Sequence, residues 1–103
     1  MKIQSDGDTV RASAIDELSA ANANSFRDET RHAFGQEQRN IEIDLSQTTA
    51  VDSCGLGALV ALHKTAAARG GVLRLLNPTP QVQQILELTR MHRIFEVVHN
   101  QHA

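Results

Sequence analysis

The chain has 103 residues, of which 41% are apolar and 21% charged, a composition typical of one soluble globular domain. Ten basic and twelve acidic residues give a formal charge of -2, and Trp and Tyr are absent, so a nucleic-acid partner is not expected. A single cysteine excludes an internal disulfide and a thiolate zinc cluster. Because no segment is apolar enough to span a bilayer and the first ten residues lack the apolar core of a secretory signal, we expect a cytoplasmic protein without a membrane partner.

The first third of the chain predicts a hairpin followed by a helix. Residues Thr9–Ser13 form a candidate strand after the turn signal Asp6-Gly7-Asp8, and Lys2–Gln4 can pair with it. From Ala20 to Phe34 the apolar residues recur at helical spacing, which predicts a helix with one buried stripe. Gly35 follows it, and we expect this glycine to end the helix in the left-handed conformation.

The middle of the chain predicts a strand and a second helix. Apolar and acidic residues alternate from Ile41 to Leu45, as in a strand buried on one face, although so short a pattern also fits a strand covered on both faces. After a polar turn, apolar residues mark a helix from Leu56 to Ala68. The pair Gly70-Gly71 is expected to end it, with Arg69 beside the negative pole of the helix dipole.

The last third predicts a strand at Val72–Leu76, a helix capped by Thr79 with Pro80 as its first residue, and a final apolar segment at 94–98. This alternation indicates an α/β fold with right-handed crossovers. We expect residues 1–103 to form a single domain, with a mainly parallel sheet of about four strands and three to four helices packed against it. Its radius of gyration should be about 13 Å.

The segment Asp52–Gly57 is the strongest candidate for a functional site. Ser53 lies where the strand Ile41–Leu45 and its following turn give way to a helix, and free N–H groups and the helix dipole favour a phosphate there. Gly55 and Gly57 would keep the surface low and let another chain approach the backbone. Local spacing fits equally well with Ser53 as an ordinary N-cap and with both glycines serving internal packing.

A resemblance to a known family distinguishes these readings. The chain resembles the STAS domain of bacterial anti-sigma factor antagonists between Ile41 and Val98. The motifs that carry it are Asp44-Leu45-Ser46, Val51 to Gly57, Gly70-Gly71, Leu86 to Thr89, and Ile94-Phe95-Glu96. The resemblance therefore implies the STAS fold and a regulatory protein that is not an enzyme and holds no cofactor or metal.

The resemblance also implies a mechanism. In the family, the unmodified antagonist binds an anti-sigma factor that is also a serine kinase, which frees a sigma factor. Phosphorylation of the serine after the motif aspartate ends the binding, and by position that serine is Ser53; a phosphatase would reverse the modification. The implied partner-binding residues are Asp52, Ser53, Cys54, Gly55, Leu56 and Gly57.

Other relatives of the family imply an alternative function. In these a STAS domain is a regulatory subunit docked on an ATPase or in a stress-signalling assembly. Ser53 would then contact a partner without being phosphorylated. In either case His63 and Lys64, on the expected exposed side of the second helix, could extend the partner surface.

Three residues depart from the family pattern. Cys54 stands where many relatives have Ser or Thr, which leaves Ser53 as the only hydroxyl in the motif core. Ser19 stands where relatives commonly have Asp, beside the phosphorylation loop. Arg90 stands where relatives usually have Gly, and it is strained if the position requires a positive φ.

Two catalytic or metal-binding alternatives have less support in the sequence. Cys54 at a helix N-terminus could act as a nucleophile, but the arginine that a phosphatase-type loop needs is missing from Gly55 to Val60. The five histidines include no pair three or four residues apart within one predicted helix. We therefore expect neither an active-site cysteine nor a metal site.

Overall fold

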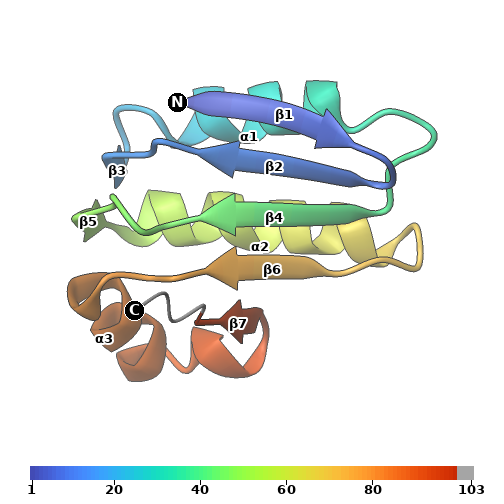
Figure 1. The fold of residues 1–103 in the computed structure, drawn as a ribbon. Helices are drawn as coiled ribbons and strands as arrows, with labels where there is room; N and C mark the ends of the chain where they lie inside the picture. The colour runs from blue at the N-terminus through green and yellow to red at the C-terminus, as the bar shows by residue number, and fades with distance from the viewer. Residues whose placement is uncertain (100–103) are drawn as a thin grey trace.

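The computed structural model describes residues 1–99, which form two small sheets, three α-helices and one 3-10 helix (Figure 1). The strands are β1 (Lys2–Asp6), β2 (Thr9–Ser13), β3 (Glu17–Leu18), β4 (Asn40–Asp44), β5 (Ala50–Val51), β6 (Leu73–Leu76) and β7 (Glu96–Val98). The helices are α1 (Ala23–Ala33), α2 (Ser53–Ala67), α3 (Pro80–Leu88) and the 3-10 helix η1 (Met91–Arg93). Within residues 1–99 no helix combines the length and apolar character needed to cross a membrane.

The main sheet has five strands in the order β1-β2-β4-β6-β7. Only β1 runs antiparallel to its neighbour, because it is joined to β2 by the Gly7 turn, and all other neighbours in this sheet are parallel. The predicted α/β fold with a mainly parallel sheet is confirmed, with five strands instead of about four. A second sheet, formed by two residues each of β3 and β5, was not predicted because such short strands leave no periodic pattern.

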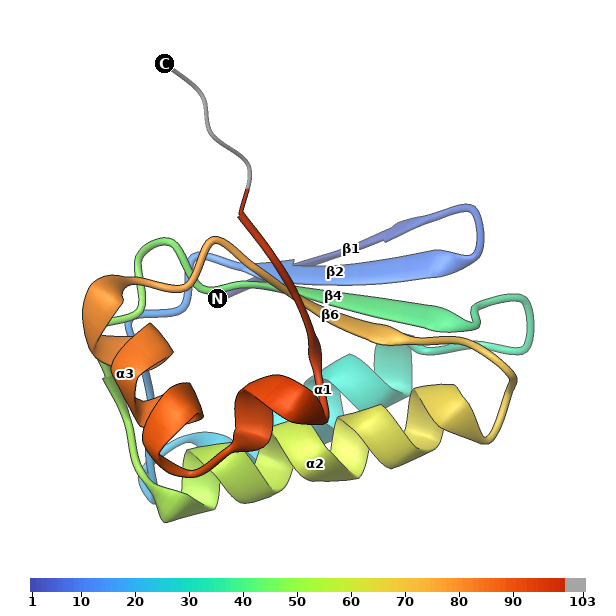
Figure 2. The same ribbon diagram turned by 90° about the horizontal axis from the view of Figure 1, so that it is seen from below.

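All helices lie on one face of the main sheet (Figure 2). Alternate strand residues point to this face and are fully buried there with side chains of α1 and α2. The largest of these buried residues include Val10, Phe26, Ile41, Ile43, Leu59, Leu62, Leu73 and Leu75. The alternation in Ile41–Leu45 therefore reflects a strand covered on one face only. The radius of gyration is 12.4 Å, close to the expected value.

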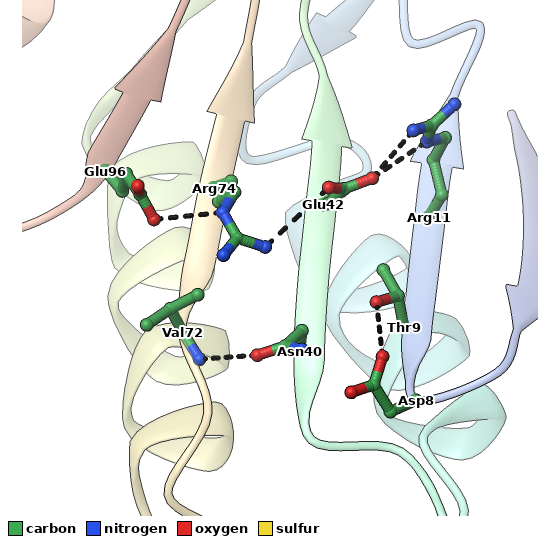
Figure 3. Close-up of polar contacts among 8 residues, drawn as sticks. All are labelled: Asp8, Thr9, Arg11, Asn40, Glu42, Val72, Arg74 and Glu96. Carbon is green, nitrogen blue, oxygen red and sulfur yellow. Dashed lines mark hydrogen bonds and ion pairs between the residues drawn. The ribbon is translucent and has the colours of Figure 1, made fainter.

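The other face of the sheet carries a row of alternating charges (Figure 3). Arg11, Glu42, Arg74 and Glu96 are neighbours across β2, β4, β6 and β7. Glu42 accepts from Arg11 at 2.7 Å and lies 3.8 Å from Arg74, which in turn donates to Glu96 at 3.0 Å. Each charge in this row of four therefore has an opposite charge beside it on the next strand.

Several predicted helix ends differ in detail. Gly35 is not left-handed; α1 ends one residue earlier, and the Gly35 N–H donates to the Gln38 side chain. Arg69 follows the C-cap of α2, and its guanidinium stacks on Phe34 and donates to backbone carbonyls between α1 and β4. Gly70, with φ 75°, is left-handed beyond α2 as expected. Thr79 caps α3 with Pro80 as its first residue, as predicted.

Candidate functional site

The candidate site lies at the end of the sheet where β5 gives way to α2 (Figure 1). Val51 is buried, Asp52 is extended with φ -107° and ψ -173°, and Ser53 is the first residue of α2. This abrupt change of backbone direction exposes Ser53 and Cys54 to solvent. The first turn of α2 contains no acidic residue, and the carboxylate at the start of this helix is that of the preceding Asp52.

Asp52, and not Ser53, caps α2. Its Oδ1 accepts from the backbone N–H of Gly55 at 3.0 Å, and its Oδ2 accepts from the N–H of Ala20 at 2.9 Å. Both hydrogen bonds favour the ionised carboxylate and lower the pKa of Asp52 below its ordinary value of 3.8. The bond from Gly55 has the larger effect, and the bond from Ala20 the next. The interpretation of Ser53 as an N-cap is therefore wrong, and its hydroxyl is not occupied in capping.

Asp52 also joins two loops that are distant in sequence. The Asp52 N–H donates to the carbonyl of Leu18 at 3.0 Å, while Ala20 donates back to the Asp52 side chain. Ser19 lies between these two contacts, which places it beside the Asp52–Ser53 loop. The loop before α1 is thus fixed against the start of α2, and a partner that covers Ser53 meets both segments.

The two glycines of the motif have different roles. A Cβ on Gly55 would lie 2.8 Å from the carbonyl carbon and from the Cβ of Leu18, so this buried position is closed to any side chain by the chain itself. A Cβ on Gly57 would meet nothing within 4 Å, and Gly57 is exposed. The expectation that both glycines open the surface to a partner is therefore wrong for the buried Gly55 and stays a prediction for Gly57.

The remaining predicted site residues separate into surface and core. Leu56 is buried, whereas Cys54 and Lys64 are exposed. His63 is only half exposed and packs edge-on against Phe95, with 5.8 Å between ring centroids. The exposed residues that the structure brings together around the start of α2 are Asp52, Ser53, Cys54 and Gly57.

A supporting residue that the sequence did not reveal is Thr48. It is fully buried, and its hydroxyl donates to the Ile15 carbonyl at 2.6 Å. Its own carbonyl accepts from the Thr79 hydroxyl at 2.6 Å. Thr48 therefore ties the turn before β5 to the segment after β2 and to the start of α3. A threonine in a polar run gives no signal that distinguishes such a role from that of an ordinary turn residue.

Comparisons with known proteins agree with this arrangement. The STAS domain family matches residues 2–103. A Thermotoga maritima protein named "Putative anti-sigma factor antagonist" is 32% identical over 82 residues, which cover 79% of this chain and 73% of that protein. The unphosphorylated form of the anti-sigma factor antagonist SpoIIAA has the same fold, with a TM-score of 0.84 and 20% identity over 97% of this chain and 87% of SpoIIAA.

The fold also matches SpoIIAA of Bacillus in its phosphorylated form, with a TM-score of 0.76 and 19% identity over 97% of this chain and 90% of that one. The family match covers nearly the whole chain, and the Thermotoga relative supports it at the level of sequence. The chain belongs to the STAS domain family of anti-sigma factor antagonists.

Proposed function

We propose that this chain is an anti-sigma factor antagonist that is switched by phosphorylation of Ser53. In this proposal the unphosphorylated form binds an anti-sigma factor that is also a serine kinase, and a sigma factor is released. Phosphorylated Ser53 ends the binding, and a phosphatase restores it. The observation that carries the proposal is the exposed Ser53 hydroxyl at the first position of α2, beside an Asp52 that is held by two backbone N–H groups.

The site can accept a phosphate without a change of fold. A phosphoserine adds a charge of about -1.5 to -2, and at the start of a helix this charge meets free N–H groups and the positive end of the dipole. The Asp52 carboxylate is held by the N–H groups of Gly55 in α2 and of Ala20 in the loop before α1, so it cannot turn away without losing both bonds. SpoIIAA has been solved in both phosphorylation states, and both structures match this fold.

The same phosphate would oppose a partner that covers the loop. The partner would have to remove water from two neighbouring negative groups, the phosphate and the Asp52 carboxylate. A hundredfold loss of affinity corresponds to only about 2.7 kcal/mol, which this desolvation and any partner carboxylate nearby can supply. We propose that Asp52, Ser53, Cys54 and Gly57 contribute exposed contacts, while the buried Gly55 and Leu56 hold the loop in shape.

The proposal is tested by incubating the protein with its anti-sigma factor kinase and ATP, then mapping the phosphate by mass spectrometry. We expect one phosphate on Ser53 and none on the Ser53→Ala variant. Phosphate on another residue, or equal phosphorylation of the wild type and the Ser53→Ala variant, would contradict the assignment. Failure of phosphorylation together with copurification of an ATPase would instead favour a docked regulatory subunit.

A further inference from the structure

Two surfaces at opposite edges of the molecule complement each other in charge and in apolar character. At the edge formed by α3 and η1, Leu88 is 76% exposed and Ile94 is 46% exposed. Arg90 and Arg93 are exposed on the same segment, and neither guanidinium has an ion pair within residues 1–99. We call these four residues the basic apolar patch.

The opposite edge carries a shallow groove of about 530 Å³ between β1 and α1. Ile3 and Ala33 are half-buried against the core, and they form the apolar part of its lining. Asp28 and Glu29 are exposed carboxylates on the same lining, which His32 completes. Asp28 lies 3.3 Å from its neighbour Arg27 in a solvent-exposed pair, which holds it only weakly. We call this the acidic groove.

We propose that the basic apolar patch of one molecule docks in the acidic groove of a second copy. Two guanidinium groups would meet two carboxylates, and Leu88 and Ile94 would lose water against Ile3 and Ala33. The strand order places β1 and β7 at opposite edges of the sheet, with α1 beside β1 and η1 immediately before β7 (Figures 1 and 2). The contact is therefore head to tail, and because it joins two different surfaces, each added copy leaves a free patch and a free groove.

Other surfaces fit this role less well. The bare face of the sheet offers no unpaired charge along its central row, because Arg11, Glu42, Arg74 and Glu96 already neutralise one another (Figure 3). An anionic membrane is a poorer partner for the basic apolar patch than the groove is, since two cations add little attraction to a lipid surface. Neither the patch nor the groove includes the Ser53 loop, so the association does not depend on phosphorylation.

The contact should be weak. Stable protein interfaces bury roughly 1,200 to 2,000 Å² in total, and a few side chains on each side bury less than that. We therefore expect the average molar mass, measured by sedimentation equilibrium, to rise with protein concentration up to about 1 mM and to fall when salt is added. Such weak, salt-sensitive association follows from a contact whose specificity is mainly electrostatic.

Charge reversal gives a sharp test. We expect the double variants Arg90→Glu/Arg93→Glu and Asp28→Lys/Glu29→Lys each to associate at least tenfold more weakly than the wild type, because each has like charges on its two surfaces. An equimolar mixture of the two variants should regain association, since each then offers the opposite charge to the other. Arg39→Glu, a reversal at an exposed residue outside both surfaces, should associate like the wild type.

Two results would overturn the proposal. One is a wild-type protein that stays monomeric at 1 mM in low salt. The other is a mixture of the two variants that stays as monomeric as its components while circular dichroism shows both to be folded. Binding of the wild type to vesicles containing anionic lipid, lost in Arg90→Glu/Arg93→Glu but not in Asp28→Lys/Glu29→Lys, would assign the patch to a membrane instead.

Discussion

At the scale of single residues, Asp52 explains why the motif serine remains available. One carboxylate caps α2 through Gly55 and holds the Ala20 backbone, so the helix start is satisfied without the Ser53 hydroxyl. In this chain the aspartate does the capping, and the neighbouring Ser53 hydroxyl takes no part in it.

Asp52→Asn should reveal this role through its dependence on pH. The folded-state pKa of Asp52 lies below 3.8, mainly through the Gly55 and Ala20 bonds, so its contribution to stability is complete above the unfolded pKa and is lost as pH falls through the folded one. An asparagine can accept one of these bonds but presents an N–H to the other donor. We expect the variant to be less stable than the wild type at pH 7, with the gap closing as pH falls below about 4.

The measurement is urea unfolding of both proteins between pH 2.5 and 7. Asp16→Asn is the control, because Asp16 is exposed and its carboxylate makes no hydrogen bond within residues 1–99. Its stability should track the wild type across the range. A constant gap between Asp52→Asn and the wild type at every pH would refute the assigned role.

Arg90 has a backbone conformation that predicts a measurable effect on stability. It follows α3 with φ 60° and ψ 18°, in the left-handed region where a side chain is strained. The sequence predicts strain at Arg90 only if the position requires a positive φ, and the structure confirms that φ is positive there. We expect Arg90→Gly to raise the free energy of unfolding by about 0.5 to 1 kcal/mol, because relief of the strain exceeds the extra entropy of an unfolded glycine.

Arg90→Ala is the matched variant, since it removes the side chain but keeps Cβ. Its stability should stay close to that of the wild type, whereas Arg90→Gly should melt about 4 °C higher. If Ala and Gly gave equal melting temperatures, the left-handed strain would not be the cause.

At the scale of elements, the start of α2 is positioned by a close approach of backbones. Gly55 lies against Leu18, the second residue of β3, while Gly57, two positions on, faces open space. The same substitution at these two positions should therefore have opposite effects. Gly55→Ala forces Leu18 and the β3 segment to move, at a cost of about 1 to 3 kcal/mol.

Gly57→Ala should instead stabilise the protein by about 0.5 to 1 kcal/mol, because alanine is the better helix former and meets no neighbour. Thermal unfolding followed at 222 nm compares both variants with the wild type. Two substitutions with the same sign of effect would show that the packing at Leu18 does not set the position of α2.

At the scale of the whole molecule, local sequence patterns were enough to predict the strands β2, β4 and β6 and the body of each α-helix. Alternation indicated β4, turn and breaker residues bounded β2 and β6, and helical spacing of apolar residues indicated the α-helices. These patterns could not predict the pairing of β3 with β5, because two residues give no pattern, and yet this pairing brings Leu18 and Asp52 together. The candidate site was chosen from the motif around Ser53, and its role stays a prediction. The sequence could not distinguish its two glycines, because their difference lies in a backbone carbonyl from another part of the chain.

The affinity of the anti-sigma factor kinase for this protein, measured by isothermal titration before and after phosphorylation of Ser53, tests the central claim most directly. We predict that binding is at least a hundredfold weaker after phosphorylation. Ser53→Asp should also bind more weakly than the wild type, but by a smaller factor, and its circular dichroism should be unchanged. Ser25→Asp adds a carboxylate to the first turn of α1 and should bind like the wild type. Equal affinity of the phosphorylated and unphosphorylated forms would contradict the account.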